Sequence, residues 1–223
     1  MAKLGGRVFV GIFLSCIATA PNAQANTSFR ADSIIAVMEN NWNKINDCTC
    51  ILESFVKKDE TEQFHKLEYM FMKPQWIKMK IIAGDNKGTT IVFDPLKKRV
   101  LVRIGGIMGL LPLSLSPDNP KTQSIRGHRS DNNHIGWTIT RWKEYLHTTT
   151  FKAFYKDGSV VLEALGVDSL KYNGTYKELL YLNPETAFPV KIEHYSYDGE
   201  LLHWIKMYDI RTNTGLKIED FEI

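Results

Sequence analysis

The sequence of 223 residues lacks the short motifs that identify the common enzyme sites. It contains no Gly-x-Ser-x-Gly nucleophile turn, no His-Glu-x-x-His helix, no phosphate-binding loop and no dinucleotide fingerprint. Its acidic residues mostly stand near a lysine or an arginine, as in KKDE and YKDG, which is typical of a solvated surface. We therefore expect a protein that is not an enzyme and that uses no cofactor.

The chain also lacks a marked excess of charge, with 28 lysines and arginines against 25 aspartates and glutamates. Two of the basic residues, Lys3 and Arg7, lie in the first 25 residues, which lowers the basic count of residues 26–223 from 28 to 26. Binding to nucleic acid needs a concentrated basic surface. We expect no nucleic-acid partner.

Long hydrophobic runs are absent after residue 25, so the sequence predicts no membrane-spanning segment in residues 26–223. The first 25 residues look like a signal peptide, with basic MAKLGGR, apolar VFVGIFLSCIATA and the small-x-small pattern Ala23-Gln24-Ala25. We expect export to the periplasm, cleavage before Asn26, and one domain over residues 26–223. The alternative is a lipoprotein anchored at Cys16, in the segment FLSC.

Cysteine is scarce, and two of the three cysteines, Cys48 and Cys50, stand in the expected strand DCTCILESFV. Residues i and i+2 of a strand lie about 7 Å apart, which is beyond normal disulfide reach. Either the strand bulges there or both thiols are buried, and we favour burial of two free thiols. No second cysteine pair is present to complete a metal site.

Two helices are predicted from apolar residues at helical spacing. The first is capped by Asp32 or Ser33 and ends near Asn46. The second is capped by Asn132 or Asn133. Their apolar stripes are Ile34, Met38, Trp42 and Ile45 in the first helix, and Ile135, Ile139, Trp142 and Leu146 in the second.

The rest of the chain reads as strands separated by short turns, two of which contain the Asp-Gly pair that favours hairpins. We expect strands over residues 48–57, 64–72, 76–82, 89–93, 99–104, 160–165, 176–182, 190–197 and 201–210. Hairpin-length connections imply antiparallel pairing. The predicted fold is mainly β (α+β): a curved antiparallel sheet of about nine to eleven strands, forming a half-open barrel with both helices at its concave side.

The six histidines show no spacing typical of metal ligands. They are His65, His128, His134, His147, His194 and His203. His128 and His134 are near neighbours in a polar stretch without a ligand-spaced carboxylate, so we expect them to be solvated or to cap turns. The sequence predicts no metal site and no catalytic residue.

One uncharged apolar stretch, IGGIMGLLPLSL at residues 104–115, stands out between hydrophilic segments. Its glycines and proline disfavour the interior of a helix or a strand. It is either a loop whose leucines join the core, or a flap over the mouth of the barrel that contacts an acyl chain. Loops on rigid scaffolds often carry binding residues, and methionine adapts to apolar ligands.

The order of several segments resembles a family of uncharacterised exported bacterial proteins and, more distantly, the outer-membrane lipoprotein carrier and receptor proteins. The similarity covers about residues 45 to 221 and rests on the segments MFMKPQWIKMK, KGTTIVFDPLKKRVLV, LPLSLSPDNP, HIGWTITRW and FPVKIEHYSYDGELLHWIKMYDIRTNTGLKIEDF. The resemblance implies an open antiparallel barrel of about eleven strands, lidded by helices, with an apolar interior that binds acyl chains. The long apolar stretch before the second helix departs from the pattern of the true carriers.

From these observations we expect a periplasmic binding or carrier protein for a lipid or an acylated protein, or alternatively a module of the same fold that senses or binds an envelope protein. The expected ligand-binding residues are Ile104, Ile107, Met108, Leu110, Leu111, Leu113, Met70, Met72, Trp76 and Trp142.

Overall fold

The computed structural model describes residues 30–106 and 111–223. The helices are α1 (Ala31–Asn43) and α2 (Ile135–Thr148), with short 3₁₀ helices η1 (Pro120–Thr122), η2 (Ser130–Asn132) and η3 (Ile218–Phe221). The strands are β1 (Asp47–Lys58), β2 (Thr61–Met72), β3 (Trp76–Gly84), β4 (Thr90–Asp94), β5 (Arg99–Arg103), β6 (Leu113–Leu115), β7 (Thr150–Lys156), β8 (Ser159–Leu165), β9 (Lys177–Leu182), β10 (Pro189–Tyr195) and β11 (Leu201–Thr212). Within these residues, neither α1 nor α2 has the length and hydrophobicity of a membrane-spanning helix.

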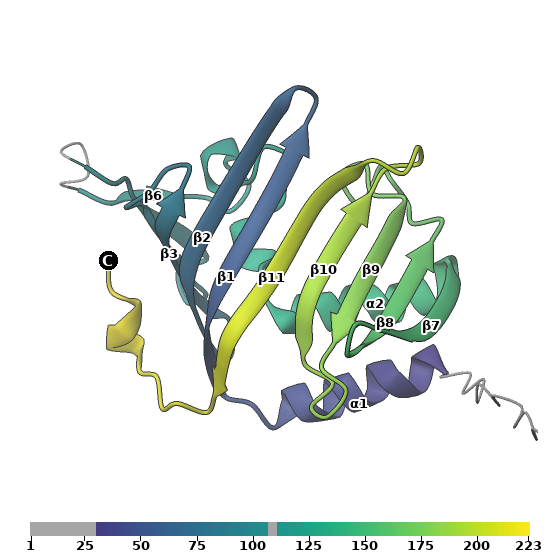
Figure 1. The fold of residues 1–223 in the computed structure, drawn as a ribbon. Coiled ribbons are helices and arrows are strands. Elements are labelled where there is room, and N and C mark those ends of the chain that lie inside the picture. Colours follow the sequence, from purple (N-terminus) through teal and green to yellow (C-terminus); the bar gives the residue numbers. More distant parts are fainter. Residues whose placement is uncertain (1–29, 107–110) are drawn as a thin grey trace, which may run out of the picture.

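All eleven strands form one sheet in the order β6-β5-β4-β3-β2-β1-β11-β10-β9-β8-β7. Every pair is antiparallel, and the two meanders β1–β6 and β7–β11 join where β1 pairs with β11. The sheet curves without closing, so β6 and β7 remain its edges (Figure 1). The predicted half-open antiparallel barrel is confirmed.

Turn chemistry explains why the strands pair locally. Asp157 and Gly158 both have positive φ, of 48° and 77°, as the two central residues of a tight hairpin require. They place Lys156 opposite Ser159 and thereby set the register between β7 and β8.

Both helices pack into the main core, α2 across the concave side of the sheet and α1 along the lower ends of its strands (Figure 1). The inward side of α1 buries Ile35, Met38 and Trp42, and the Trp42 ring lies 5.0 Å from that of Phe71 on β2. The predicted stripe of α2 is confirmed, since Ile135, Ile139 and Trp142 are buried and Leu146 is partly buried against the same core.

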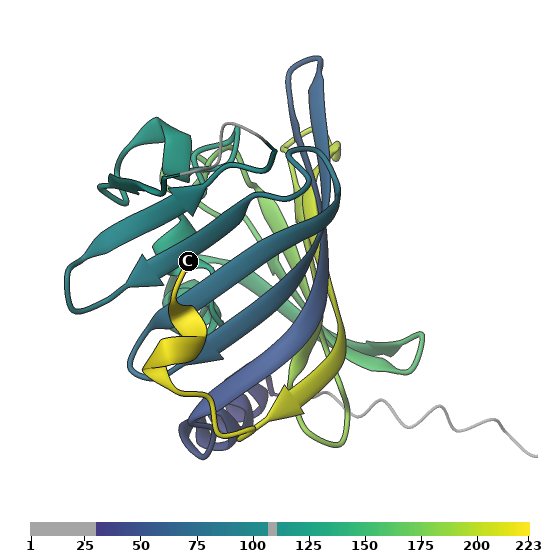
Figure 2. The same ribbon diagram turned by 90° about the vertical axis from the view of Figure 1, so that its left-hand side faces the viewer.

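The convex side of the sheet is covered in part by the C-terminal segment, which runs over it to η3 (Figure 2). Phe221 of η3 packs against Trp76 of β3, with ring centroids 5.7 Å apart. Lys78, on the same side of β3, donates hydrogen bonds to the backbone oxygens of Asp220 and Glu222. A second, smaller apolar cluster therefore lies outside the barrel.

The predicted helix caps are wrong. Arg30 occupies the N-cap position of α1 without a side-chain hydrogen bond, and Asp32 lies in the first turn of the helix. In α2 the cap is His134, whose Nδ1 accepts a hydrogen bond from the backbone N–H of Trp137 at 3.2 Å. This confirms the turn-capping role expected for His134.

Two of the eleven strands were not predicted from the sequence. The edge strand β7 follows α2 after a single residue, and β6 lies inside the apolar stretch that was expected to contain no strand. The three residues of β6 pair with β5, where Leu113 stands opposite Val102.

Cys48 and Cys50 are both buried and free, as predicted. The ladder between β1 and β11 is also irregular between Thr49 and Ile51. Both features considered for this segment, burial and a bulge, are therefore present together.

Candidate functional site

The concave side of the sheet contains a cavity of about 1070 Å³. Its floor includes one cross-strand row of side chains running from the edge strand β6 to the central strand β1, each residue paired with the next in the sheet: Leu113, Val102, Ile91, Met79, Tyr69 and Cys50. Alternate residues of a strand face opposite sides of the sheet. The inward row is therefore largely apolar, although each strand also contains polar residues that face outward.

The segment 116–134 covers part of this cavity and contributes many of its lining residues. It is folded on itself, because Thr122 Oγ1 donates to the backbone oxygens of Pro117 and Asn119, and Gln123 pairs with Arg129. Arg126 ties it to the barrel by donating to the backbone oxygens of Lys57 and Asn173.

The structure brings together two of the ten expected ligand-binding residues at the cavity. Ile104 and Leu113 line it and are about half exposed, whereas Leu111 is 81 % exposed and does not line it. Ile107, Met108 and Leu110 lie outside the described residues.

The other four expected residues do not line the cavity. Met70, Met72 and Trp76 are on the convex side of the sheet, in the small cluster beneath Phe221. Trp142 is completely buried in the main core. Period-two spacing shows which strand residues share a side, but it does not show which side is concave.

A buried carboxylate, which the sequence analysis did not single out, lies at one end of the cavity. Glu178 on β9 is completely buried, in contrast to the solvated surface expected for the acidic residues. Its carboxylate accepts hydrogen bonds from three side chains of α2: Arg141 Nη2 at 2.6 Å, Trp142 Nε1 at 2.8 Å and Tyr145 Oη at 3.0 Å. The helix is thereby held against the sheet.

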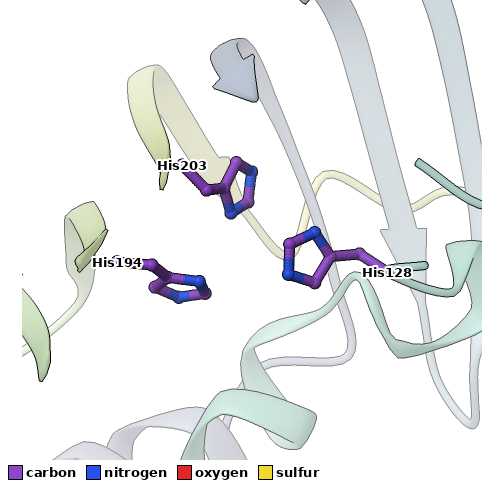
Figure 3. A group of neighbouring side chains, drawn as sticks. All are labelled: His128, His194 and His203. Atoms are coloured by element: carbon purple, nitrogen blue, oxygen red, sulfur yellow. The ribbon is translucent and has the colours of Figure 1, made fainter. Parts of the chain in front are cut away.

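Three histidines, His128, His194 and His203, lie close together (Figure 3), and His194 Nε2 is 3.5 Å from Glu178 Oε2. Glu178, His194 and His203 stand opposite one another on β9, β10 and β11, and all three line the cavity. His128 reaches them from the covering segment, with its ring stacked on that of His203 at a centroid distance of 4.7 Å. His128 is not solvated as expected, because its ring packs against the sheet, and its Nδ1 also lies 3.1 Å from Ser124 Oγ across the turn at residues 124–128.

The surroundings keep these imidazoles neutral at physiological pH. Burial, together with the nearby Arg141 and Arg126, lowers the pKa of His128 to about 4. Burial lowers the pKa of His194 and His203 well below the ordinary value, and neighbouring histidines and Arg141 act in the same direction. Each ring then offers one N–H donor and one lone pair.

One part of this cluster had a signal in the sequence. The turn at Asp198-Gly199 lies midway between His194 and His203, so a two-residue hairpin loop would pair them. The structure pairs His194 with His203, although the connection is longer than two residues and the ladder is irregular between His194 and Tyr195. The approach of His128 had no such local signal, because about 65 residues separate it from His194 in the chain.

No protein-family model and no curated protein matches the chain. Among solved structures, an uncharacterised conserved protein from Thermus thermophilus has 10 % identity and a TM-score of 0.53 over 86 % of this chain and 91 % of its own. A DUF1329 family protein from Desulfovibrio piger has 11 % identity and a TM-score of 0.50, with coverages of 86 % and 95 %.

A putative outer membrane lipoprotein-sorting protein domain from Vibrio parahaemolyticus is also similar, with 14 % identity, a TM-score of 0.45 and coverages of 86 % and 97 %. At such low identities a likeness establishes the fold alone. The chain therefore shares its overall fold with the Thermus and DUF1329 structures.

Proposed function

We propose that this protein is an exported binding or carrier protein that holds the acyl chain of a lipid or of an acylated protein in the cavity on the concave side of its sheet. The observation that carries the proposal is the apolar inward row from Leu113 to Cys50 along a cavity of about 1070 Å³. Small-molecule sites commonly have volumes of about 300 to 1,000 Å³.

Burial of an acyl chain in such a cavity would release enough free energy for binding. Each methylene that leaves water contributes about 0.8 kcal/mol. About twelve methylenes would contribute about 10 kcal/mol before the entropy cost of association is subtracted. The half-exposed Ile104 and Leu113 would contact the chain at the β6 side of the cavity.

Titration with a fluorescent fatty-acyl probe tests the proposal on protein stripped of lipid, since a bound lipid would compete and would raise the apparent stability. Ile104→Asp and Leu113→Asp should each weaken probe binding about tenfold or more, because a contact worth about 1.5 to 3 kcal/mol is replaced by a charge. Both residues are about half exposed, so these variants should fold.

Matched controls are Leu96→Asp and Leu170→Asp, which place the same charge at exposed leucines that do not line the cavity. They should bind the probe like the wild type. Equal weakening in all four variants would place the probe elsewhere. Absence of probe binding by the wild type would reject acyl cargo and favour a module that binds an envelope protein.

A further inference from the structure

Nitrogens of His128, His194 and His203 converge from two strands and the covering segment beside the cavity. One ligand atom from each histidine lies within 4.8 Å of the other two. Zinc–nitrogen bonds measure about 2.0–2.1 Å, which puts two nitrogens of a tetrahedral site about 3.3 Å apart. Rotations of the side chains that move each nitrogen by less than about 1 Å would bring the three into bonding distance.

Two of these rings have buried nitrogens without hydrogen-bond partners. They are Nδ1 and Nε2 of His194 and Nδ1 of His203, within the described part of the chain. Nε2 of His194 lies 3.5 Å from Glu178 Oε2 but forms no hydrogen bond with it. A buried polar atom without a partner is unfavourable, so a ligand that engages these nitrogens would stabilise the fold.

We propose that His128, His194 and His203 form a binding site for a divalent transition metal ion, with Zn²⁺ as the reference ion. Imidazole nitrogens suit zinc, copper, nickel and iron, whereas calcium and magnesium prefer oxygen ligands. Three protein ligands leave a fourth position for a small molecule or a water, and here it would face the cavity that all three histidines line.

The neighbouring groups fit this role. The neutral state of the three rings, maintained by burial, is the state that binds metal. Ser124 Oγ lies 3.1 Å from Nδ1 of His128. This contact occupies Nδ1 and leaves Nε2 to bind the ion. The carboxylate of Glu178 offsets the charge of Arg141, and the other nearby cation, Arg126, donates to the backbone oxygens of Lys57 and Asn173.

Equilibrium dialysis of the chelator-treated protein against zinc chloride, followed by metal analysis, tests the site. The wild type should bind one zinc ion per chain. His128→Gln and His203→Gln should each weaken this binding at least a hundredfold. His147→Gln, a change at an exposed histidine of α2, is the matched control and should retain one ion with unchanged affinity.

Ser124→Ala provides a milder variant that leaves all three ligands in place. Loss of a group that orients a ligand typically weakens metal binding 10–100-fold, so the variant should bind zinc in that weaker range. Circular dichroism checks that each variant is folded. If the glutamine variants do not fold, Ser124→Ala and a zinc-dependent rise in the melting temperature of the wild type decide the question.

Three outcomes would overturn the proposal. The first is a wild type that binds no zinc, cobalt, nickel or copper. The second is zinc binding that remains unchanged in the folded glutamine variants. The third is binding of inorganic phosphate or acetate that excludes zinc from the cluster, since the rings would then act as N–H donors beside Arg141. Because zinc binding is measured without an acyl probe, failure here leaves the acyl-chain proposal standing.

Discussion

Trp142 Nε1 donates a hydrogen bond of 2.8 Å to Glu178 Oε1, and both side chains are completely buried. This contact joins the middle of α2 to the inner side of β9. Since the same carboxylate also accepts from Arg141 and Tyr145, three residues of the helix depend on one acidic side chain of the sheet. The hydrogen bond fixes the position of the helix, and the indole ring supplies its buried apolar area.

Trp142→Ala should therefore lower the free energy of unfolding by about 3–5 kcal/mol, the usual cost of removing a buried large aromatic ring. Trp142→Phe keeps most of the apolar volume but removes the donor, and should cost about 1–3 kcal/mol. Urea denaturation measures both, with the surface change Lys143→Ala as the control. A loss below about 1 kcal/mol for Trp142→Ala would contradict the packing of α2.

Asp47→Asn should weaken the attachment of the C-terminal segment. The carboxylate of Asp47, at the start of β1, accepts hydrogen bonds from Thr214 N and Oγ1 and from Gly215 N. Hydrogen bonds to a charged group are worth about 1.5–3 kcal/mol, so the variant should lose an amount of that order at neutral pH.

This loss should depend on pH. Burial raises the pKa of Asp47, but the hydrogen bonds from Thr214 and Gly215 outweigh it and hold the pKa below its ordinary value of 3.8. Because the folded pKa is depressed, the stabilisation is complete above that value and disappears as the pH falls through the folded pKa. Urea titrations of both proteins across the acid range measure it. A constant difference down to the lowest pH would contradict this assignment.

Cys48 and Cys50 should react very slowly with thiol reagents in the folded protein. Burial raises the pKa of both thiols to about 12, with a smaller contribution from Asp47 to Cys48 and from Cys48 to Cys50. At about pH 8 the thiolate fraction then falls about a thousandfold below that of an exposed cysteine. Labelling under unfolding, non-reducing conditions should find both thiols free. Rapid labelling of native protein would contradict their burial.

Leu111→Asp should leave the melting temperature nearly unchanged, because the side chain of Leu111 is 81 % exposed. Leu115→Asp, four residues later on β6, is the contrasting variant. Leu115 packs against the main core, and burying a charge there should destabilise the fold by several kcal/mol. Equal effects in the two variants would show that the end of the apolar stretch packs differently from this arrangement.

The pattern Ala23-Gln24-Ala25 predicts that the exported protein begins at Asn26. N-terminal sequencing of protein recovered from the periplasm measures this directly. Recovery of intact Met1, or of a chain that begins with an acylated Cys16, would reject cleavage at that position.

The sequence alone determined the elements whose signals are local. The stripe of α2 and nine of the eleven strands follow from spacing within a dozen residues, because side chains repeat every 3.6 residues in a helix and every two in a strand. The antiparallel order within each meander follows from short turns such as Asp157-Gly158. The edge strands β6 and β7 were missed, since three residues are too few to show a period and β7 directly follows a helix.

Tertiary structure decided which side of each strand became the interior. The alternation in β2 and β3 separates Tyr69 and Met79 from Met70 and Trp76, but only the curvature of the sheet made the first pair line the cavity. The cap of α2 likewise depended on how segment 116–134 arrives at His134. His128 contacts His194 and His203 only because the same segment reaches β10 and β11. Contacts between residues so distant in the chain result from the closure of a long loop against a curved sheet, which no local pattern records.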